Sequence, residues 1–314
     1  MEFTLESETA VVFPGMGPTQ AADAVEFMKN TPEARRLTAV ADDVLGYSLA
    51  DALLSSDDDY SEAAQVAFVV NSLALAEWAG NEYGVDPAVC VGPSFGGRAA
   101  AVFSGALTAE EGIGLAAELA RRTEEYFAAE HGDIVTHSFV RIPEQALKGL
   151  LEELDARSEW HDVACVIDAD FTMLSLRESR VDWLKQRIRA LGGLPLYTMR
   201  PPMHSAVFDG LRASAEEAMS GLSFADPRLP VVDDHDGTVL TTGEGVRTML
   251  LDTFVRALHW PDAVAALKGL GVRSVCVCGQ DALFGRVPVT RNSFQVIPVT
   301  PKLVAVRARS ATAT

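Results

Sequence analysis

Short apolar runs alternate with amphipathic helical patterns in the first part of the chain. An apolar run at residues 10–13 leads into Pro14-Gly15-Met16-Gly17-Pro18, which is too rich in glycine and proline to be helical. A second apolar run at residues 89–91 precedes a long helical stretch at residues 98–129 that carries one interruption. Buried strands that alternate with helices predict an α/β core built on a parallel sheet.

The pattern changes from about Ser138. Strand-like and helix-like segments now follow one another in the order βαββαβ, which is the order of a ferredoxin-like unit: residues 138–142, 143–156, 162–167, 172–176, 181–191 and 194–198. We therefore expect a small ferredoxin-like subdomain, residues 135–200, inserted into a large α/β-hydrolase-like core made of residues 1–134 and 201–314.

The remainder of the chain is expected to return to the large core. Helical patterns resume from Ala206, a strand is predicted at residues 229–232, a helix extends through Val255, and a further strand is predicted at residues 274–278. After Lys302 the sequence is rich in arginine, alanine and threonine, and we expect this terminal segment to fray.

Composition narrows the class of protein. Of the 314 residues, 48% are apolar and 22% charged, and no apolar run reaches the roughly 18 residues that a membrane span needs. The N-terminal sequence lacks the basic leader and apolar core of a signal peptide, so we expect a cytoplasmic protein without a membrane partner. The net charge of −18 repels phosphates at long range and argues against nucleic acid as a partner.

The cysteines predict core packing and not metal binding. All four lie in apolar strand-like stretches, where reduced thiols pack like small apolar side chains: Cys90, Cys165, Cys276 and Cys278. No second pair of cysteines or histidines completes a zinc-binding set. We expect no metal site.

A Gly-x-Ser-x-Gly pattern stands directly after the second predicted strand, at Gly92-Pro93-Ser94-Phe95-Gly96. A nucleophile elbow uses this pattern, because its glycines let strand and helix approach while a strained turn lifts the serine hydroxyl. The five residues alone would equally suit a plain strand-to-helix turn.

A serine nucleophile also needs a general base that takes its proton. Of the six histidines, His204 stands apart, because it lies where the small subdomain returns to the core.

Five motifs, in order, resemble those of malonyl-CoA:acyl carrier protein transacylases and polyketide synthase acyltransferases. They span nearly the whole chain and comprise Phe13–Gln20, Gly92–Gly97, Ser104–Leu107, Met203–Ser205 and Leu229–Asp234. This resemblance implies a ping-pong acyltransferase that binds no cofactor of its own and takes acyl groups from the phosphopantetheine of acyl carrier proteins, or from CoA. Carrier proteins would serve as both donor and acceptor.

The resemblance also assigns roles to particular residues. Ser94 would be the nucleophile and His204 its base, with backbone amides of Met16 and Phe95 as the oxyanion hole. Counting back from Trp260, the carbonyl that orients the histidine would be that of Thr253.

Residues that would line the acyl pocket depart from the family pattern, and Leu119 departs most. Counting from Ser94, Leu119 takes the place of an arginine that binds the malonyl carboxylate in this family, and a buried carboxylate without a partner is costly. A local shift could instead bring in Arg121 or Arg122, although two residues turn a helix by about 200°. The other expected pocket residues are Gln65, Pro93, Pro202 and Met203.

These departures predict a pocket with one cation fewer, and Asp168 and Asp170, by alignment, would add a carboxylate. Such a pocket suits a neutral or amine-bearing acyl group. The Gly-Pro-Ser-Phe-Gly-Gly variation resembles discrete VinK-type acyltransferases of macrolactam antibiotic pathways, which move aminoacyl or dipeptidyl groups between carrier proteins. We therefore expect transfer of a non-carboxylated acyl group in polyketide biosynthesis.

Three alternatives remain open: a malonyl-CoA:acyl carrier protein transacylase, a hydrolase that edits acyl carrier proteins, and a catalytically inactive carrier-protein binder. Acyl carrier proteins are acidic, as is this chain, so local cations must offset their repulsion. Candidates for contact with the carrier protein or the pantetheine phosphate are Arg200, Arg286 and Arg291.

Overall fold

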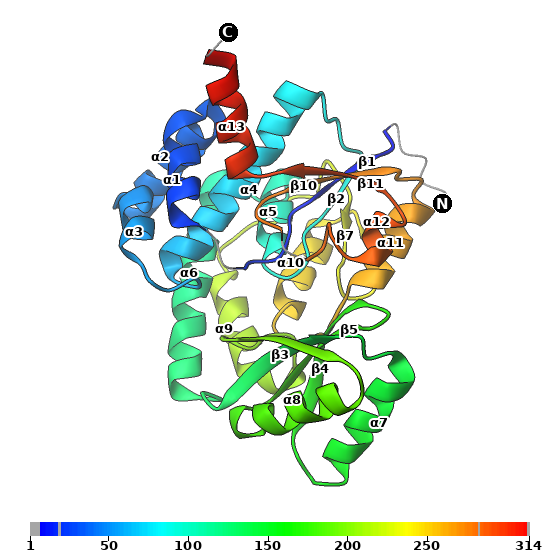
Figure 1. Cartoon of the computed structure of the whole chain (residues 1–314). Helices are drawn as coiled ribbons and strands as arrows, with labels where there is room; N and C mark the ends of the chain where they lie inside the picture. The colour runs from blue at the N-terminus through cyan, green and yellow to red at the C-terminus, as the bar shows by residue number, and fades with distance from the viewer. Residues whose placement is uncertain (1–6, 18–19, 282, 313–314) are drawn as a thin grey trace.

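A six-stranded sheet forms the centre of the larger part of the molecule (Figure 1). The computed structural model describes residues 7–17, 20–281 and 283–312, with side chains up to Arg307. The strand order is β11-β10-β1-β2-β7-β8, and all neighbours are parallel except the antiparallel β7–β8 pair. Their bounds are β1 Thr9–Val12, β2 Val89–Val91, β7 Val231–Val232, β8 Val239–Leu240, β10 Ser274–Cys278 and β11 Gln295–Val299. The predicted α/β class is confirmed.

Helices cover both faces of this sheet, so its strands are apolar on both sides. Val11 and Cys90 pack into a cluster with the helices of the first half of the chain, whereas Val12 and Val91 pack against Trp260 and its helix. The helices are α1 Ala21–Asn30, α2 Pro32–Leu45, α3 Leu49–Ser55, α4 Glu62–Tyr83, α5 Gly96–Phe103, α6 Ala109–Ala129, α9 Asp209–Ala218, α10 Gly243–Asp252, α11 Trp260–Gly269, α12 Pro288–Arg291 and α13 Pro301–Thr312.

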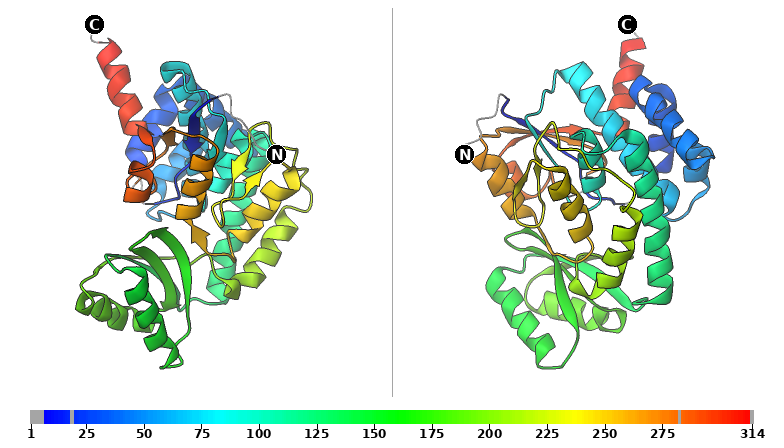
Figure 2. Two further views of the ribbon diagram at one scale, coloured as in Figure 1. Left: turned by 90° about the vertical axis from the view of Figure 1, so that its right-hand side faces the viewer. Right: turned by 180° about the vertical axis from the view of Figure 1, so that it is seen from behind.

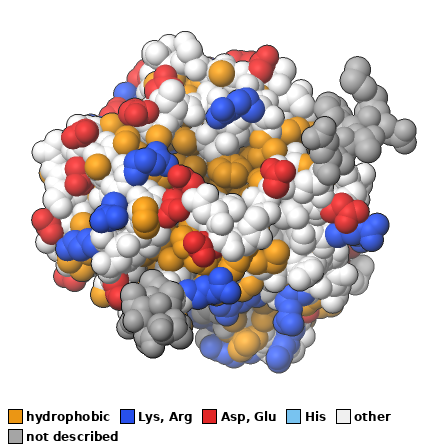
Figure 3. Space-filling model, turned by 90° about the horizontal axis from the view of Figure 1, so that it is seen from above, with side chains coloured by type: hydrophobic (Ala, Val, Ile, Leu, Met, Phe, Trp, Pro, Cys, Tyr) orange, Lys and Arg blue, Asp and Glu red, His pale blue; other side chains and the backbone are white. Residues whose placement is uncertain are grey.

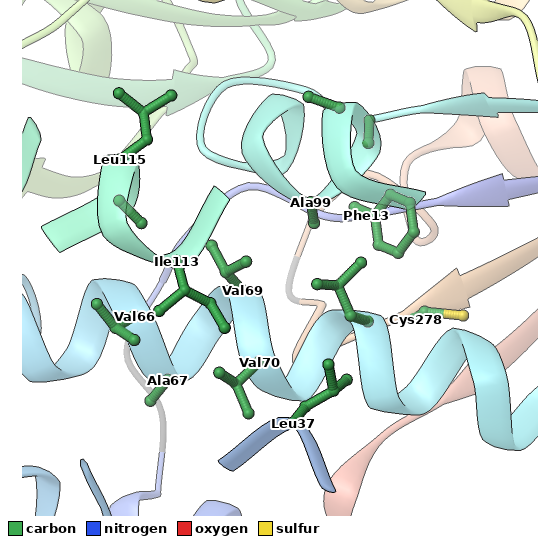
Figure 4. Close-up of a cluster of buried hydrophobic side chains, with 14 of the residues drawn as sticks. Phe13, Leu37, Val66, Ala67, Val69, Val70, Ala99, Ile113, Leu115 and Cys278 are labelled. Carbon is green, nitrogen blue, oxygen red and sulfur yellow. The ribbon is translucent and has the colours of Figure 1, made fainter. Parts of the chain in front are cut away.

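Helix α4 crosses the middle of the larger cluster (Figure 4). Its apolar residues run all round the helix, which is typical of a helix buried on every side. Val66, Val69 and Val70 lie between Ile113 of α6 and Leu37 of α2. This packing holds the core in place and so positions the loops after β1 and β2.

A smaller unit lies below the core in the views of Figures 1 and 2. Its elements are β3 Ile134–Val140, α7 Glu144–Asp155, β4 His161–Asp168, β5 Phe171–Arg177, α8 Val181–Ala190 and β6 Leu194–Met199. The antiparallel order β6-β3-β5-β4 is ferredoxin-like, and α7 and α8 cover the face turned away from the core. The other face shares a buried cluster with the core strands through Ala164, Ile167 and Met173.

Sequence reasoning missed three short or edge strands. Strand β9 (Leu258–His259) comes from the core but pairs in parallel with β4, so it extends the small sheet. Strand β11 contains Pro298, which cannot donate to a ladder and is tolerated here because β11 is an edge strand. Strand β8 has two residues and carries too little pattern to detect.

The expectation that the terminal segment frays was wrong. Residues 303–312 belong to α13, which contacts α1 and buries Val304 in the main core cluster. An apolar contact of this kind holds a terminal helix in place where composition alone suggests a loose tail.

The surface and the cysteines fit the composition. None of the helices in the described part of the chain is both long enough and apolar enough to cross a bilayer. The four cysteines are buried and free. On the face seen in Figure 3, acidic and basic side chains are interspersed, so the net charge of −18 does not form one continuous acidic surface there.

Candidate active site

Ser94 stands on a sharp turn between β2 and α5. Its backbone φ is +54°, a left-handed value that is strained for a residue with a side chain. Two glycines make the turn possible. A Cβ on Gly92 would lie 2.1 Å from the Gly96 oxygen, and one on Gly96 would lie 2.0 Å from the Phe13 oxygen. The segment therefore has the close strand–helix approach that a nucleophile elbow requires.

Asp234, in the loop after the neighbouring strand β7, holds this turn by a hydrogen bond. Strands β2 and β7 are parallel neighbours, so the loops that follow them lie at the same edge of the sheet. The Ser94 N–H donates to Asp234 Oδ2 at 2.7 Å. Hydrogen bonds to a carboxylate are among the stronger ones in proteins, so this contact stabilises the strained backbone of Ser94.

His204 meets Ser94 from the segment that leaves the small subdomain. Its Nε2 lies 2.9 Å from Ser94 Oγ. The adjoining Ser205 is held on two sides, because its N–H donates to the Phe254 oxygen at 3.2 Å and its hydroxyl donates to Asp162 Oδ2 at 2.6 Å. The structure thus brings together the two residues that sequence reasoning chose as nucleophile and base, across 110 positions of chain.

The carbonyl that orients His204 is that of Arg256, so the assignment to Thr253 was wrong. His204 Nδ1 lies 3.1 Å from the Arg256 oxygen. Thr253 still belongs to the end of α10, where its N–H bonds Met249, and its helical backbone directs its own carbonyl along the helix axis. Arg256 lies beyond the turn, and its side chain is anchored to Asp236 and Asp252.

This contact fixes the tautomer of His204. A carbonyl oxygen can only accept, so Nδ1 of the imidazole must carry the proton. In a neutral ring Nε2 is then an acceptor, and it faces the Ser94 hydroxyl. The dyad is arranged for His204 to remove the proton of Ser94.

The pKa of His204 favours the same role. Burial, together with the charge of His235, lowers its pKa to about 3, although the bond to Arg256 opposes this shift. Burial alone would also lower the pKa of His235, but Asp234 and Asp233 outweigh it and raise that pKa. Near neutral pH, His204 is therefore the uncharged base beside a buried ion-paired cluster.

We predict that the rate of Ser94 acylation stays nearly constant as the pH falls from about 8 to about 5. The lower end of this range is below the ordinary histidine pKa of about 6.5. The neutral form of His204 is the active form, and its lowered pKa keeps that form populated throughout this range. Single-turnover acylation rates across the pH range provide the measurement. A midpoint near the ordinary histidine value would contradict the lowered pKa.

Met16 and Phe95 are the residues predicted to form the oxyanion hole. Both line the same cavity as Ser94 and His204. Neither backbone N–H donates a hydrogen bond to another described residue, so both amides are available to a ligand. Their assignment as oxyanion donors remains a prediction that this geometry supports.

A cavity of about 690 Å³ opens beside the dyad, between the core and the small subdomain. Its walls come from the loops after β1 and β2, the inner face of the small sheet, and the segment that carries His204. Aspartates gather on this lining, at Asp57, Asp58, Asp59 and Asp281, together with one arginine, Arg200. This space is large enough for a pantetheine arm with an acyl group of several atoms.

A second, much smaller cavity of about 10 Å³ is also lined by Ser94. Leu119 and Met203 line it, and Met203, Ser94 and Phe95 also line the large cavity. Gln65, Pro93 and Pro202, which were expected in the acyl pocket, line neither of these two cavities. Leu119 therefore lies beside the nucleophile, as the alignment predicted, but the pocket around it differs from the expectation.

The main difference is Arg98, which sequence reasoning missed. Its side chain is buried and lines the small cavity together with Leu119. A buried arginine from α5 therefore lines this cavity, where the sequence predicted no cation. The available signal was its place in the first turn of the helix that directly follows Ser94.

The expected extra carboxylate was also misplaced. Asp168 ends β4, and its two carboxylate oxygens accept from the N–H groups of Ala169 and Val289, so it serves the turn and the domain contact. Asp170 lies at the exposed tip of the same turn. Neither lines the large cavity, whose carboxylates come from the aspartates after α3 and from Asp281.

Arg121 and Arg122 do not reach the pocket. Arg121 is exposed and pairs with Glu62 and Glu118, whereas Arg122 pairs with Glu118 and donates to the Ser214 oxygen. Arg286 and Arg291 are exposed and, among the described residues, have no ion-pair partner. Arg200 donates to the Gly132 oxygen and pairs with Glu178.

Asp233, Asp234 and His235 form a buried cluster behind the dyad. His235 Nδ1 lies 2.5 Å from Asp233 Oδ1 and 3.3 Å from Asp234 Oδ1. These atoms are also grouped closely enough to hold a metal ion. Their mutual contacts already pair them, and the expectation of no metal site stays a prediction.

Known proteins resemble this chain over most of its length. Residues 138–199 match the family model of the VinK acyltransferase small domain. A malonyl CoA-acyl carrier protein transacylase of Bacillus subtilis is 23% identical over 92% of this chain and 73% of its own length. A non-reducing polyketide synthase of Aspergillus oryzae is 26% identical over 83% of this chain, which spans only 12% of that much longer protein.

The fold is shared with a solved complex of a type II polyketide synthase acyl carrier protein and its malonyl-transacylase. The TM-score is 0.81 at 22% identity, covering 93% of this chain and 96% of that one. The elbow, the histidine that faces it and the inserted small subdomain are the features on which the sequence resemblance rested. Together with the matched small-domain model, they make this chain similar to malonyl-CoA:acyl carrier protein transacylases and to polyketide synthase acyltransferases.

Proposed function

We propose that this protein transfers an acyl group from one acyl carrier protein to another in polyketide biosynthesis, through an acyl-enzyme on Ser94. The observation that carries the proposal is the 2.9 Å contact between Ser94 Oγ and His204 Nε2, with the proton of the imidazole held on the far side by Arg256. A relative whose solved complex contains an acyl carrier protein supports the choice of partner.

The first half-reaction loads the enzyme. His204 Nε2 takes the hydroxyl proton while Ser94 Oγ attacks the thioester carbonyl of the donor, and the oxyanion faces the Met16 and Phe95 amides. Collapse of the tetrahedral intermediate breaks the C–S bond. The phosphopantetheine thiolate leaves with the proton from His204, and an ester on Ser94 remains.

The second half-reaction runs in reverse with a new carrier protein. Its thiol gives a proton to His204, its sulfur attacks the Ser94 ester, and the C–O bond breaks as Ser94 takes the proton back. No other cofactor is required by these steps. A water molecule in place of the thiol would release free acid, which is the activity of the hydrolase alternative.

We propose a non-carboxylated acyl group, such as an aminoacyl or dipeptidyl group. Leu119 beside the nucleophile and the aspartates along the large cavity support this choice, because carboxylates suit an amine and leucine offers nothing to an anion. One observation favours the malonyl alternative: the buried guanidinium of Arg98 at the small cavity could bind a carboxylate.

Incubation with an acylated donor and an unloaded acceptor carrier protein tests the proposed transfer. We expect aminoacyl groups to move to the acceptor faster than malonyl groups, with little free acid. Preferred loading from malonyl-CoA would establish the transacylase alternative, and release of free acid without movement to the acceptor would establish the hydrolase alternative.

We predict that charge reversal at Arg286 and Arg291 slows acyl discharge to a carrier protein by roughly tenfold, because both side chains are exposed and unpaired among the described residues. Discharge to a small thiol should slow far less. Arg273→Glu is the matched control, since Arg273 precedes β10 at the opposite end of the parallel strands from Ser94. Equal slowing with carrier protein and small thiol would refute a docking role.

A further inference from the structure

Arg98 places a positive charge beside the nucleophile. It lies in the first turn of α5, a helix that begins two residues after Ser94. Its side chain is only 7% exposed, and it lines the small cavity that Ser94 also lines. Arg98 and the nucleophile therefore line one cavity.

The guanidinium is held in position by neutral groups. Arg98 Nη1 donates to Gln65 Oε1 at 2.9 Å, and the Arg98 Cζ atom lies 4.5 Å from the centre of the Phe95 ring. Gln65 is itself oriented, because its Nε2 donates to the Tyr60 oxygen at 2.8 Å, which leaves Oε1 facing the arginine. These contacts fix the orientation of the Arg98 guanidinium without neutralising its charge.

No carboxylate among the described residues forms an ion pair with Arg98. Burial lowers its pKa to about 10, which still leaves it charged near neutral pH. A guanidinium has five N–H donors, and a buried charge without an ionic partner destabilises the fold. An arginine that served only to hold Gln65 could be replaced by a neutral donor at lower cost.

We propose that Arg98 is a specificity-determining residue whose guanidinium binds an acceptor oxygen of the acyl group carried by Ser94, either a carboxylate or an amide carbonyl. This inference rests on the proposed acyl transfer. The arginine lies on α5, and not on α6 where Leu119 stands, so its fork approaches the acyl group from a different helix.

Three residues line both cavities, namely Ser94, Phe95 and Met203. The small cavity of about 10 Å³ holds about one water molecule, so an acyl oxygen can reach Arg98 only if a wall moves. Met203 lines both cavities, and methionine is the most adaptable of the apolar side chains. Its rotation would join the two spaces and give the acyl group access to the guanidinium.

Two matched pairs of acyl groups on a carrier protein test the assignment. Malonyl is compared with butyryl, and acetylglycyl with pentanoyl, so that each pair has similar length but only one member carries an acceptor oxygen beyond the thioester carbonyl. The readout is the single-turnover rate of Ser94 acylation, followed by intact mass. We expect Arg98→Met to lower the rate ratio of at least one pair by roughly 10- to 100-fold, the effect of losing a charge-assisted hydrogen bond.

Two further variants keep the test informative if Arg98→Met does not fold. Arg98→Lys retains the charge but loses the fork, and should give an intermediate ratio. Gln65→Glu places a carboxylate against the guanidinium and should lower the ratio by competing with the acyl oxygen. A change confined to the malonyl pair identifies a carboxylate, and a change confined to the acetylglycyl pair identifies an amide carbonyl.

Ratios that stay within about twofold of the unmodified protein in all three variants would overturn the assignment. That outcome leaves the proposed function intact, because Ser94 would still become acylated. Failure of every acyl group to label Ser94 would instead defeat the proposed function itself.

Discussion

Ser94→Ala is expected to slow carrier-to-carrier acyl transfer by roughly a thousandfold or more, because removal of the nucleophile leaves only binding and the oxyanion donors. The structure gives this serine both a strained backbone and a base at 2.9 Å. Alanine at this position retains the backbone N–H that donates to Asp234, so the fold should be preserved. The measurement is the rate at which the acylated acceptor carrier protein appears.

Ser220→Ala is the matched control. Ser220 is exposed just beyond α9 and bonds only the Glu217 oxygen, so its loss should leave the transfer rate unchanged. Transfer by Ser94→Ala at more than about a tenth of the normal rate would show that Ser94 is not the nucleophile.

Gly96→Ala is expected to destabilise the protein by about 3 kcal/mol or more and to abolish most of its activity. The added Cβ would lie 2.0 Å from the Phe13 oxygen, so the backbone just after β1 and that of α5 would have to separate. That movement would displace both Ser94 and the loop that carries Met16. Denaturant unfolding and the acylation rate measure the two effects.

Gly97→Ala is the neighbouring control. A Cβ on Gly97 would meet Leu250 Cδ2 at 3.2 Å and Met249 Cε at 3.5 Å, which are ends of flexible side chains, and would lie 3.4 Å from the Gly92 oxygen, far beyond the 2.0 Å clash at Gly96. Alanine also favours the helix over glycine, so we expect a change in stability within about 1 kcal/mol. Similar losses at both glycines would mean that close strand–helix approach is not what Gly96 provides.

The sequence was sufficient to predict the α/β class, the ferredoxin-like unit and the pairing of Ser94 with His204. Each depends on local patterns, such as period, turn residues and a short motif, that are visible without distant contacts. The predictions that failed depend on tertiary structure. The carbonyl at Arg256 could not be found by counting residues, because its position depends on how the chain turns after α10.

Arg98 shows the same limit at the pocket. A single position, Leu119, suggested that the cation had been lost, but a pocket is assembled from several helices and a guanidinium can come from any of them. Similarly, Asp168 was predicted to add charge to the pocket, whereas its carboxylate accepts the Val289 N–H at 2.8 Å. The position and hydrogen-bond partners of such side chains can be determined only from the packed structure.

Intact-mass analysis of the enzyme during transfer tests the central claim most directly. After mixing with an acylated donor carrier protein, we expect one acyl group on the enzyme, mapped to the peptide that contains Ser94 and absent from Ser94→Ala. An unloaded second carrier protein should discharge it at least as fast as the overall transfer proceeds. Full-rate transfer without this adduct, or the same adduct on Ser94→Ala, would contradict an acyl-enzyme at the elbow.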